Sequence, residues 1–211
     1  MAATFTQAYP IGTAGTKWGD AEKAAWKATT AVSREYKTEV LAKLEPLKET
    51  FDVVQYGALS QDAERFPLYA VKSRQWDAAL PTVLVTGGVH GYETSGVQGA
   101  LLFLKDAAPA YAGKCNLAVC PCVSPWGYET IQRWNYNAED PNRGFVADST
   151  RDECALLMKY VATLGKIEVH LDLHETTDTD ESEFGPAKSA RDGVAHVGDI
   201  IPDGFYVIGD S

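Results

Sequence analysis

The alternation of apolar and polar positions along the chain predicts an ordered series of helices and strands. Residues 20–50 carry apolar side chains at roughly helical spacing, which predicts one long helix that Pro46 ends or bends. Two further helices are predicted where this spacing returns, at 94–105 and 149–165. Short runs of apolar and β-branched residues predict strands at 51–56, 67–72, 81–86, 116–123, 167–173 and 204–208.

This order of elements predicts an α/β fold. A helix and a pair of strands come first, and strands then alternate with helices. That order is typical of a mixed, mostly parallel twisted sheet with helices on both faces. The runs at 81–86 and 116–123 are largely apolar, as expected of buried strands. No shift in composition marks a boundary, so we expect residues 1–211 to form a single domain.

Composition and charge narrow the classes of function. The chain has 211 residues, of which 45% are hydrophobic, and these values are ordinary for a globular protein with a real core. The formal charge of −10 repels phosphate backbones, so nucleic acid is not expected as a partner. No apolar run is long enough to span a membrane, and the N-terminus lacks the pattern of a secretory signal, which favours a cytoplasmic protein.

The cysteines give little sign of a metal site. Cys120 and Cys122 resemble half of a metal clip, but no second cysteine pair or nearby histidine completes it. With Cys115 and Cys154, they are predicted to be buried free thiols.

Polar side chains follow the buried strands at their carboxyl ends, where ligands bind in open α/β sheets. His90 and Glu93 come after the strand at 81–86, and their spacing lets an imidazole and a carboxylate share one ion. Alone, this pair is a weak signal, and a surface pair at a helix start is the simpler interpretation. His174 ends the strand at 167–173 and completes a set of two histidines and one glutamate, which is typical of catalytic zinc.

Other polar residues near this set have more than one interpretation. His170 lies deeper in the same strand, and we expect it to be a core or supporting histidine. Asp172 either orients a metal-bound histidine or is a buried hydrogen-bond acceptor. His196 is expected at the surface.

The loop from Ser124 to Asp148 adds two arginines. The planar guanidinium fork of arginine matches a carboxylate, and an arginine near a metal suits the oxyanion of a tetrahedral intermediate. Arg133 and Arg143, each close to an asparagine, are candidates for these roles. The alternative is a salt-bridged structural loop, which for Arg133 alone is the simpler interpretation.

Together these segments resemble the motifs of a known family, the zinc metallocarboxypeptidases of carboxypeptidase A-like fold. That family includes the succinylglutamate desuccinylase/aspartoacylase group. The resemblance rests on four segments in the same order: Gly87-Gly-Val-His90-Gly-Tyr-Glu93, Arg133-Trp-Asn135, Asp140-Pro-Asn142-Arg143 and Asp172-Leu-His174. It implies the family's fold and a hydrolase that uses one zinc ion.

The resemblance also implies a role for each matching residue. His90, Glu93 and His174 would be the zinc ligands, and Arg133 would be the catalytic arginine that polarises the carbonyl. Asn142 and Arg143 would hold the substrate's terminal carboxylate. The implied substrate is a peptide or an N-acyl amino acid with a free carboxylate.

The chain departs from the family's pattern in two places. Family members carry a general-base glutamate on a later strand, and none of Glu175, Glu181 and Glu183 matches that motif. We therefore expect the single domain to lack the family's C-terminal part. Ser124-Pro-Trp-Gly also stands where the peptidases often have Asn-Pro-Asp-Gly. The predicted function is a zinc metallocarboxypeptidase, and the alternatives are an N-acyl-amino-acid deacylase or a catalytically impaired zinc-binding domain.

Overall fold

A computed structural model describes residues 9–196 and 204–209, which fall into two compact units. Residues 30–175 form the sheet unit, and the terminal unit combines the described residues of 9–29 with those after 175. Among the described residues, no helix is both long and apolar enough to cross a membrane.

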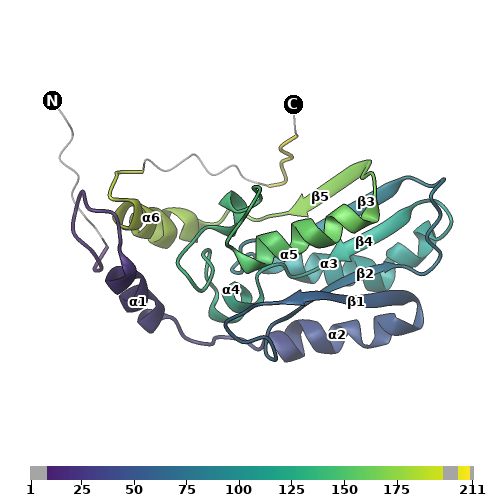
Figure 1. The fold of residues 1–211 in the computed structure, drawn as a ribbon, viewed down its shortest axis with the longest axis horizontal. Helices are drawn as coiled ribbons and strands as arrows, with labels where there is room; N and C mark the ends of the chain where they lie inside the picture. Colours follow the sequence, from purple (N-terminus) through teal and green to yellow (C-terminus); the bar gives the residue numbers. More distant parts are fainter. Residues whose placement is uncertain (1–8, 197–203, 210–211) are drawn as a thin grey trace. The chain divides into compact units, whose positions relative to one another are not determined.

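The sheet unit is built on a five-stranded mixed sheet in the order β1-β2-β4-β3-β5 (Figure 1). Strands β1 and β2 form an antiparallel hairpin, and β2 pairs antiparallel with β4. Strand β3 pairs in parallel with β4 on one side and with β5 on the other. The strands are β1 Phe51–Ala58, β2 Pro67–Ser73, β3 Thr82–Gly87, β4 Asn116–Cys120 and β5 Val169–Leu173. The predicted α/β class with a mixed sheet is confirmed, and parallel pairing is confined to β4, β3 and β5.

Helix α5, Asp152–Val161, covers one face of the sheet (Figure 1). Its residues Leu157 and Tyr160 pack into a core with Leu84 of β3 and Ala118 of β4. These strand residues alternate with neighbours that point to the other face, because successive side chains of a strand point to opposite sides. The 3₁₀ turn Ala162–Leu164 extends the helix, and Gly165 ends it with a φ of +81°.

Helix α3, Thr94–Asp106, packs against β3, β4 and β5. Its buried stripe recurs at helical spacing and consists of Val97, Ala100, Leu101 and Leu104. Shorter elements connect the sheet and its helices: the π-helix Lys37–Leu41, α2 Ala42–Leu44, the 3₁₀ turns Pro46–Glu49, Ala108–Tyr111 and Pro141–Arg143, and α4 Pro125–Thr130.

The regular elements described in the terminal unit are helices. They are α1 Asp20–Thr29, the π-helix Asp180–Phe184 and α6 Gly185–Asp192. The backbone N–H of Trp18 donates to the carbonyl of Arg191 at 2.9 Å, which joins the two sequence segments of this unit.

The prediction of one helix over 20–50 is wrong. Helix α1 ends at Thr29, and helical turns resume only at Lys37. Between them, the backbone N–H groups of Ser33 and Arg34 donate to the carbonyl of Glu129, so a distant segment takes the hydrogen bonds that a helix would need.

Two strand predictions also need correction. The strand expected at 204–208 is absent, since residues 204–209 have no strand assignment in the structure. The strand expected at 116–123 ends at Cys120. The four cysteines are buried free thiols, as predicted. Burial raises the pKa values of the Cys120 and Cys122 thiols far above their usual range, so both stay protonated.

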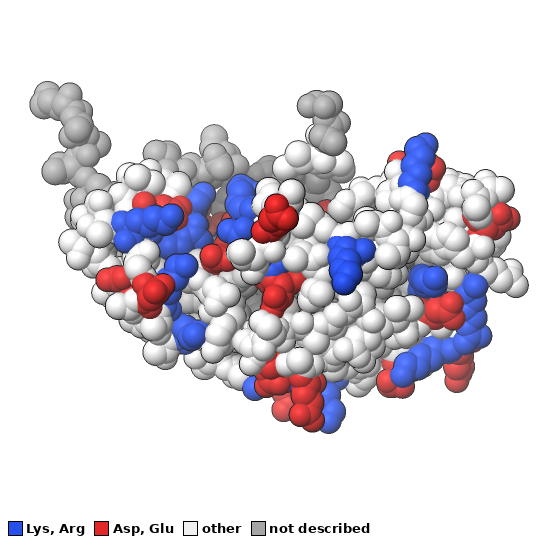
Figure 2. Space-filling view, in the orientation of Figure 1, with Lys and Arg blue, Asp and Glu red and all other residues white. Residues whose placement is uncertain are grey.

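Acidic and basic side chains are interspersed over the face shown in Figure 2.

Candidate metal centre

Three segments of the sheet unit meet beyond the carboxyl ends of the parallel strands. Strand β3 is followed by the loop with His90 and Glu93, and β5 is followed at once by His174. The long loop after β4 brings Asp140 to the same place, where it contacts His90. This convergence is expected, because parallel neighbours end at the same edge of a sheet.

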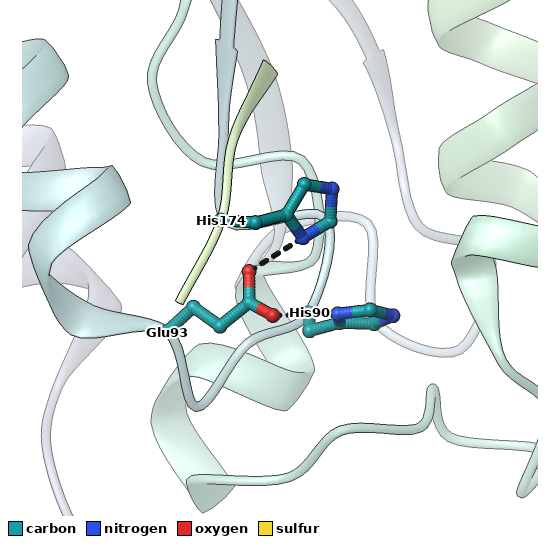
Figure 3. A group of neighbouring side chains, drawn as sticks. All are labelled: His90, Glu93 and His174. Carbon is teal, nitrogen blue, oxygen red and sulfur yellow. Dashed lines mark hydrogen bonds and ion pairs between the residues drawn. The ribbon is translucent and has the colours of Figure 1, made fainter. Parts of the chain in front are cut away.

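Glu93 is the centre of the group (Figure 3). Its Oε1 lies 2.7 Å from Nδ1 of His90, and its Oε2 lies 2.8 Å from Nδ1 of His174. The two rings have centroids 5.1 Å apart and are tilted by 59°. One donor atom from each of the three residues lies within 4.8 Å of the others, so one ion can contact all three. Two nitrogens and one carboxylate oxygen are a donor set that zinc prefers.

The Nε2 atom of each histidine contacts a second carboxylate, on the side of the ring away from Glu93. Nε2 of His90 lies 3.0 Å from Oδ1 of Asp140, and Nε2 of His174 lies 2.7 Å from Oδ2 of Asp172. A carboxylate accepts only, so each Nε2 carries the proton. The lone pair of each ring is therefore available at Nδ1 once that atom is unprotonated.

These contacts shift the pKa values of the ligand group in a consistent way. Burial disfavours the charged form of His174, but the hydrogen bonds to Asp172 and Glu93 outweigh it and raise the pKa to about 10. The pKa of His90 is also raised, by Asp140 and Glu93 against the effect of burial. Burial would raise the pKa of Glu93, yet both histidines hold it below its usual value. The negative field that favours these protons favours a divalent cation at the same atoms.

The loop between β3 and α3 needs glycine where it passes α4. Gly88 has a φ of +65°, a conformation that side chains disfavour. A Cβ atom on Gly91 would lie 1.9 Å from the carbonyl carbon of Gly127, so only glycine allows this approach. Arg34 stabilises the same loop by donating hydrogen bonds to the Gly91 carbonyl at 2.8 Å and to Oγ1 of Thr94 at 2.6 Å.

The loop after β4 brings Arg133 beside this group. Its Nε lies 3.6 Å from Oδ2 of Asp140, and its Nη1 donates to the Tyr92 hydroxyl at 3.2 Å. Asp140 also accepts from the backbone N–H of Asn142 at 2.9 Å and begins the turn that carries Asn142 and Arg143. The His90 contact and the two arginines hold the pKa of Asp140 well below its usual range, despite burial.

Arg143 is exposed, and its guanidinium donates to the carbonyl of Asn142 at 3.2 Å. The start of helix α5 and the residue before it support this turn. Arg151 donates to the Arg143 carbonyl at 3.1 Å, and the Cys154 thiol donates to the Pro141 carbonyl at 3.0 Å.

Asp172 contacts the candidate ligand His174, which agrees with the interpretation that it orients a metal-bound histidine. His170 is exposed rather than part of the core, and its Nε2 lies 2.8 Å from Oγ1 of Thr86. Glu175 accepts from the backbone N–H of Ser95 at the start of α3.

One predicted surface residue lies away from this group, and two residues beside the group were not predicted. His196 contacts Asp192 within the terminal unit, at 3.1 Å. Sequence reasoning missed Thr86 and Tyr92, because a lone hydroxyl beside a site has no spacing signature.

Three comparisons with known proteins bear on this geometry. No family model matches the chain. Carboxypeptidase 2 of Trichophyton rubrum is 29% identical over 146 residues, which is 63% of this chain and 26% of that protein. A protein of Shewanella denitrificans assigned as a metallopeptidase has a solved structure that matches with a TM-score of 0.56 and 26% identity, over 67% of this chain and 52% of that one. The metallo-carboxypeptidase of Burkholderia cenocepacia matches in fold, with a TM-score of 0.54 and 17% identity, over 64% of this chain and 40% of its own.

The predicted resemblance to the zinc metallocarboxypeptidase family is therefore confirmed. The chain spans 26% of the length of its curated relative and 52% of the solved Shewanella structure. Proteins of this kind use a metal ion, and the His-Glu-His group of this chain fits one.

Proposed function

We propose that the chain is a zinc-dependent hydrolase of the metallocarboxypeptidase type, with its ion held by His90, Glu93 and His174. One observation carries this proposal. Two histidines from separate segments direct Nδ1 at the two oxygens of one glutamate that is only 1% exposed. A buried carboxylate between two imidazoles is costly unless charge is balanced, and a divalent cation balances it.

The donor set suits catalysis as well as binding. Catalytic zinc sites use three protein ligands and leave a fourth position open, whereas structural sites use four. A zinc ion at these three ligands would supply Lewis acidity toward a scissile carbonyl and would lower the pKa of a water molecule. The distal carboxylates Asp140 and Asp172 would hold the two imidazoles in the tautomer that leaves Nδ1 free for the ion.

Other residues would bind and orient the substrate. Arg133 is 22% exposed and lies beside Asp140, and its guanidinium would donate to a carbonyl oxygen as negative charge develops. Asn142 and Arg143 share one short turn, and an exposed guanidinium there suits a terminal carboxylate. The proposed substrate is a peptide with a free C-terminal carboxylate.

Two alternatives differ in what they require. An N-acyl-amino-acid deacylase would use the same ion and arginines on a smaller substrate, and the Asp172-Leu-His174 segment suits that group too. The second alternative is a zinc-binding domain without catalysis, in which the same three residues hold the ion. Both alternatives keep the metal site and differ only in the chemistry done there.

The first experiment is metal content by mass spectrometry on wild-type protein, His174→Ala and the control His196→Ala. We expect one zinc per chain in the wild type and in the control, and none in His174→Ala. A second assay offers peptides, their C-terminal amides and N-acyl amino acids to the zinc-loaded protein. Turnover of the free peptides alone supports the carboxypeptidase, and turnover of the N-acyl amino acids supports the deacylase. Wild-type protein without zinc after loading and dialysis would refute the proposed function.

A further inference from the structure

A chain of hydrogen bonds leads from His174 back into the sheet. Nε2 of His174 lies 2.7 Å from Oδ2 of Asp172, whose other oxygen, Oδ1, lies 2.6 Å from Oγ1 of Thr86. Oγ1 of Thr86 lies 2.8 Å from Nε2 of His170. Hydrogen bonds thus join four side chains in a line. Thr86 lies on β3, His170 and Asp172 lie on β5, and His174 follows β5.

The protons along this line have only one consistent direction. Asp172 is a carboxylate and only accepts, so the single hydroxyl proton of Thr86 points at Oδ1. Thr86 then has no proton left for His170, so His170 donates from Nε2. Asp172 receives one proton from each side, and its orientation is fixed by two donors rather than one.

The register of the sheet sets up this geometry. Strands β3 and β5 are parallel, and Thr86 lies directly opposite Asp172, just as Leu84 lies opposite His170. Thr86 is 1% exposed and stands on β3, between β4 and β5. Asp172, by contrast, stands on β5, which is at the edge of the described sheet and is exposed over most of its length. The bond to Thr86 therefore ties an exposed carboxylate to a rigid, buried strand.

His174 depends on this anchor more than His90 does. The side chain of His174 is 30% exposed, whereas that of His90 is 3% exposed. Asp140, the carboxylate behind His90, is itself buried and receives a backbone N–H from its own turn. Asp172 is held instead by the hydroxyl of Thr86, which is its second donor beside His174.

We propose that Asp172, Thr86 and His170 form a positioning relay that sets how tightly the site holds its metal ion. Asp172 orients the imidazole of His174, Thr86 fixes the carboxylate of Asp172, and His170 fixes the hydroxyl of Thr86. The relay rests on the proposed function, because its effect is on zinc held by His174. If these residues only stabilised the pairing of β3 with β5, substituting them would lower the free energy of unfolding and leave zinc affinity unchanged.

The test is zinc affinity, measured by chelator competition on folded wild-type protein and variants. We expect Asp172→Asn to bind zinc about 10–100-fold more weakly, the usual cost of losing a residue that orients a metal ligand. Thr86→Val, which keeps the shape and loses the hydroxyl, should weaken binding as well, and Thr86→Ser should restore it. His170→Ala changes an exposed residue and should fold; we expect a loss of about 2–5-fold, since it acts through two intermediates.

Asp106→Asn and His196→Ala are the matched controls, and both should bind zinc as the wild type does. Cobalt-loaded protein provides a second measurement, because the visible spectrum of cobalt responds to ligand geometry and not to stability. Wild-type affinity in Asp172→Asn, Thr86→Val and His170→Ala would overturn the relay and leave the proposed function intact. A wild type that binds no zinc would overturn the proposed function itself.

Discussion

Nδ1 of His174 lies 2.8 Å from Oε2 of Glu93, although the two residues follow different strands of the sheet. The same glutamate meets Nδ1 of His90 through its other oxygen. Without an ion, each contact requires a proton on the nitrogen, since a carboxylate and a bare imidazole nitrogen are both acceptors. Protons and a metal ion therefore compete for the same two atoms.

This competition predicts that zinc uptake releases protons. The pKa of His174 is raised to about 10, so His174 carries the extra proton at pH 7 in the metal-free protein. Zinc needs the lone pair and must displace that proton, and the raised pKa of His90 acts in the same direction. We expect about one to two protons to be released per zinc at pH 7, measured by calorimetry in two buffers of different ionisation enthalpy.

The same competition predicts that zinc affinity rises with pH. Below pH 10, each unit of decreasing pH strengthens the proton as a competitor, so zinc affinity should fall about tenfold per unit for each proton displaced. Affinity should therefore rise from pH 6 to pH 8. Identical binding enthalpies in the two buffers, together with an affinity that does not change over this range, would contradict the prediction.

The sequence predicted where the candidate site would be, because the relevant signals are local. Apolar runs mark the buried strands, and the residues just after them are bound to meet at one edge of a parallel sheet. His90, Glu93 and His174 could be brought together on that argument alone. The sequence also predicted an arginine near the metal from the loop Ser124 to Asp148, and the structure places Arg133 of that loop beside Asp140.

The parts that sequence did not predict depend on register and on distant partners. Asp172 contacts Thr86 only because β3 and β5 pair with those residues opposite each other, and no local pattern gives that register. The break in the helix predicted over 20–50 likewise comes from Glu129, whose carbonyl accepts the N–H groups of Ser33 and Arg34. The run at 204–208 has strand propensity, but propensity without a paired neighbour does not make a strand.

The close approach of Gly91 to α4 predicts a large cost for one added methyl group. Gly91→Ala would place Cβ 1.9 Å from a backbone carbon of Gly127, and neither backbone can move without shifting the ligand loop. We expect a loss of about 3 kcal/mol or more in the free energy of unfolding, measured in urea on metal-free protein.

Gly99→Ala is the matched control for Gly91→Ala. Gly99 lies within α3, and a Cβ there meets nothing within 4 Å. Alanine should stabilise the helix at that position by about 0.5–1 kcal/mol. Equal effects of the two substitutions would show that Gly91 is not constrained by α4.

Arg34 predicts a second, milder effect on the ligand loop. Its guanidinium donates to the carbonyls of Gly91 and Tyr128, at 2.8 and 2.7 Å, and stacks 3.5 Å from the centroid of the Tyr128 ring. Lysine keeps the charge but has no planar fork, so Arg34→Lys should cost about 2 kcal/mol in urea unfolding. The control is Arg74→Lys, at a half-exposed arginine, which should change the free energy of unfolding by less than about 0.5 kcal/mol. Similar losses in Arg34→Lys and Arg74→Lys would argue against a role for the planar guanidinium of Arg34.

The exposed guanidinium of Arg143 predicts a selective effect on ligands that carry a carboxylate. Arg143→Ala should weaken competitive inhibitors with a free C-terminal carboxylate by about 30-fold, or about 2 kcal/mol, and should leave their amides nearly unchanged. Arg143→Lys should lose less, because it keeps the charge without the bidentate fork. The structural alternative is that Arg143 only supports its own turn, through the contact between its guanidinium and the Asn142 carbonyl. In that case acids and amides would weaken equally in Arg143→Ala, and the comparison of their inhibition constants decides between the two roles.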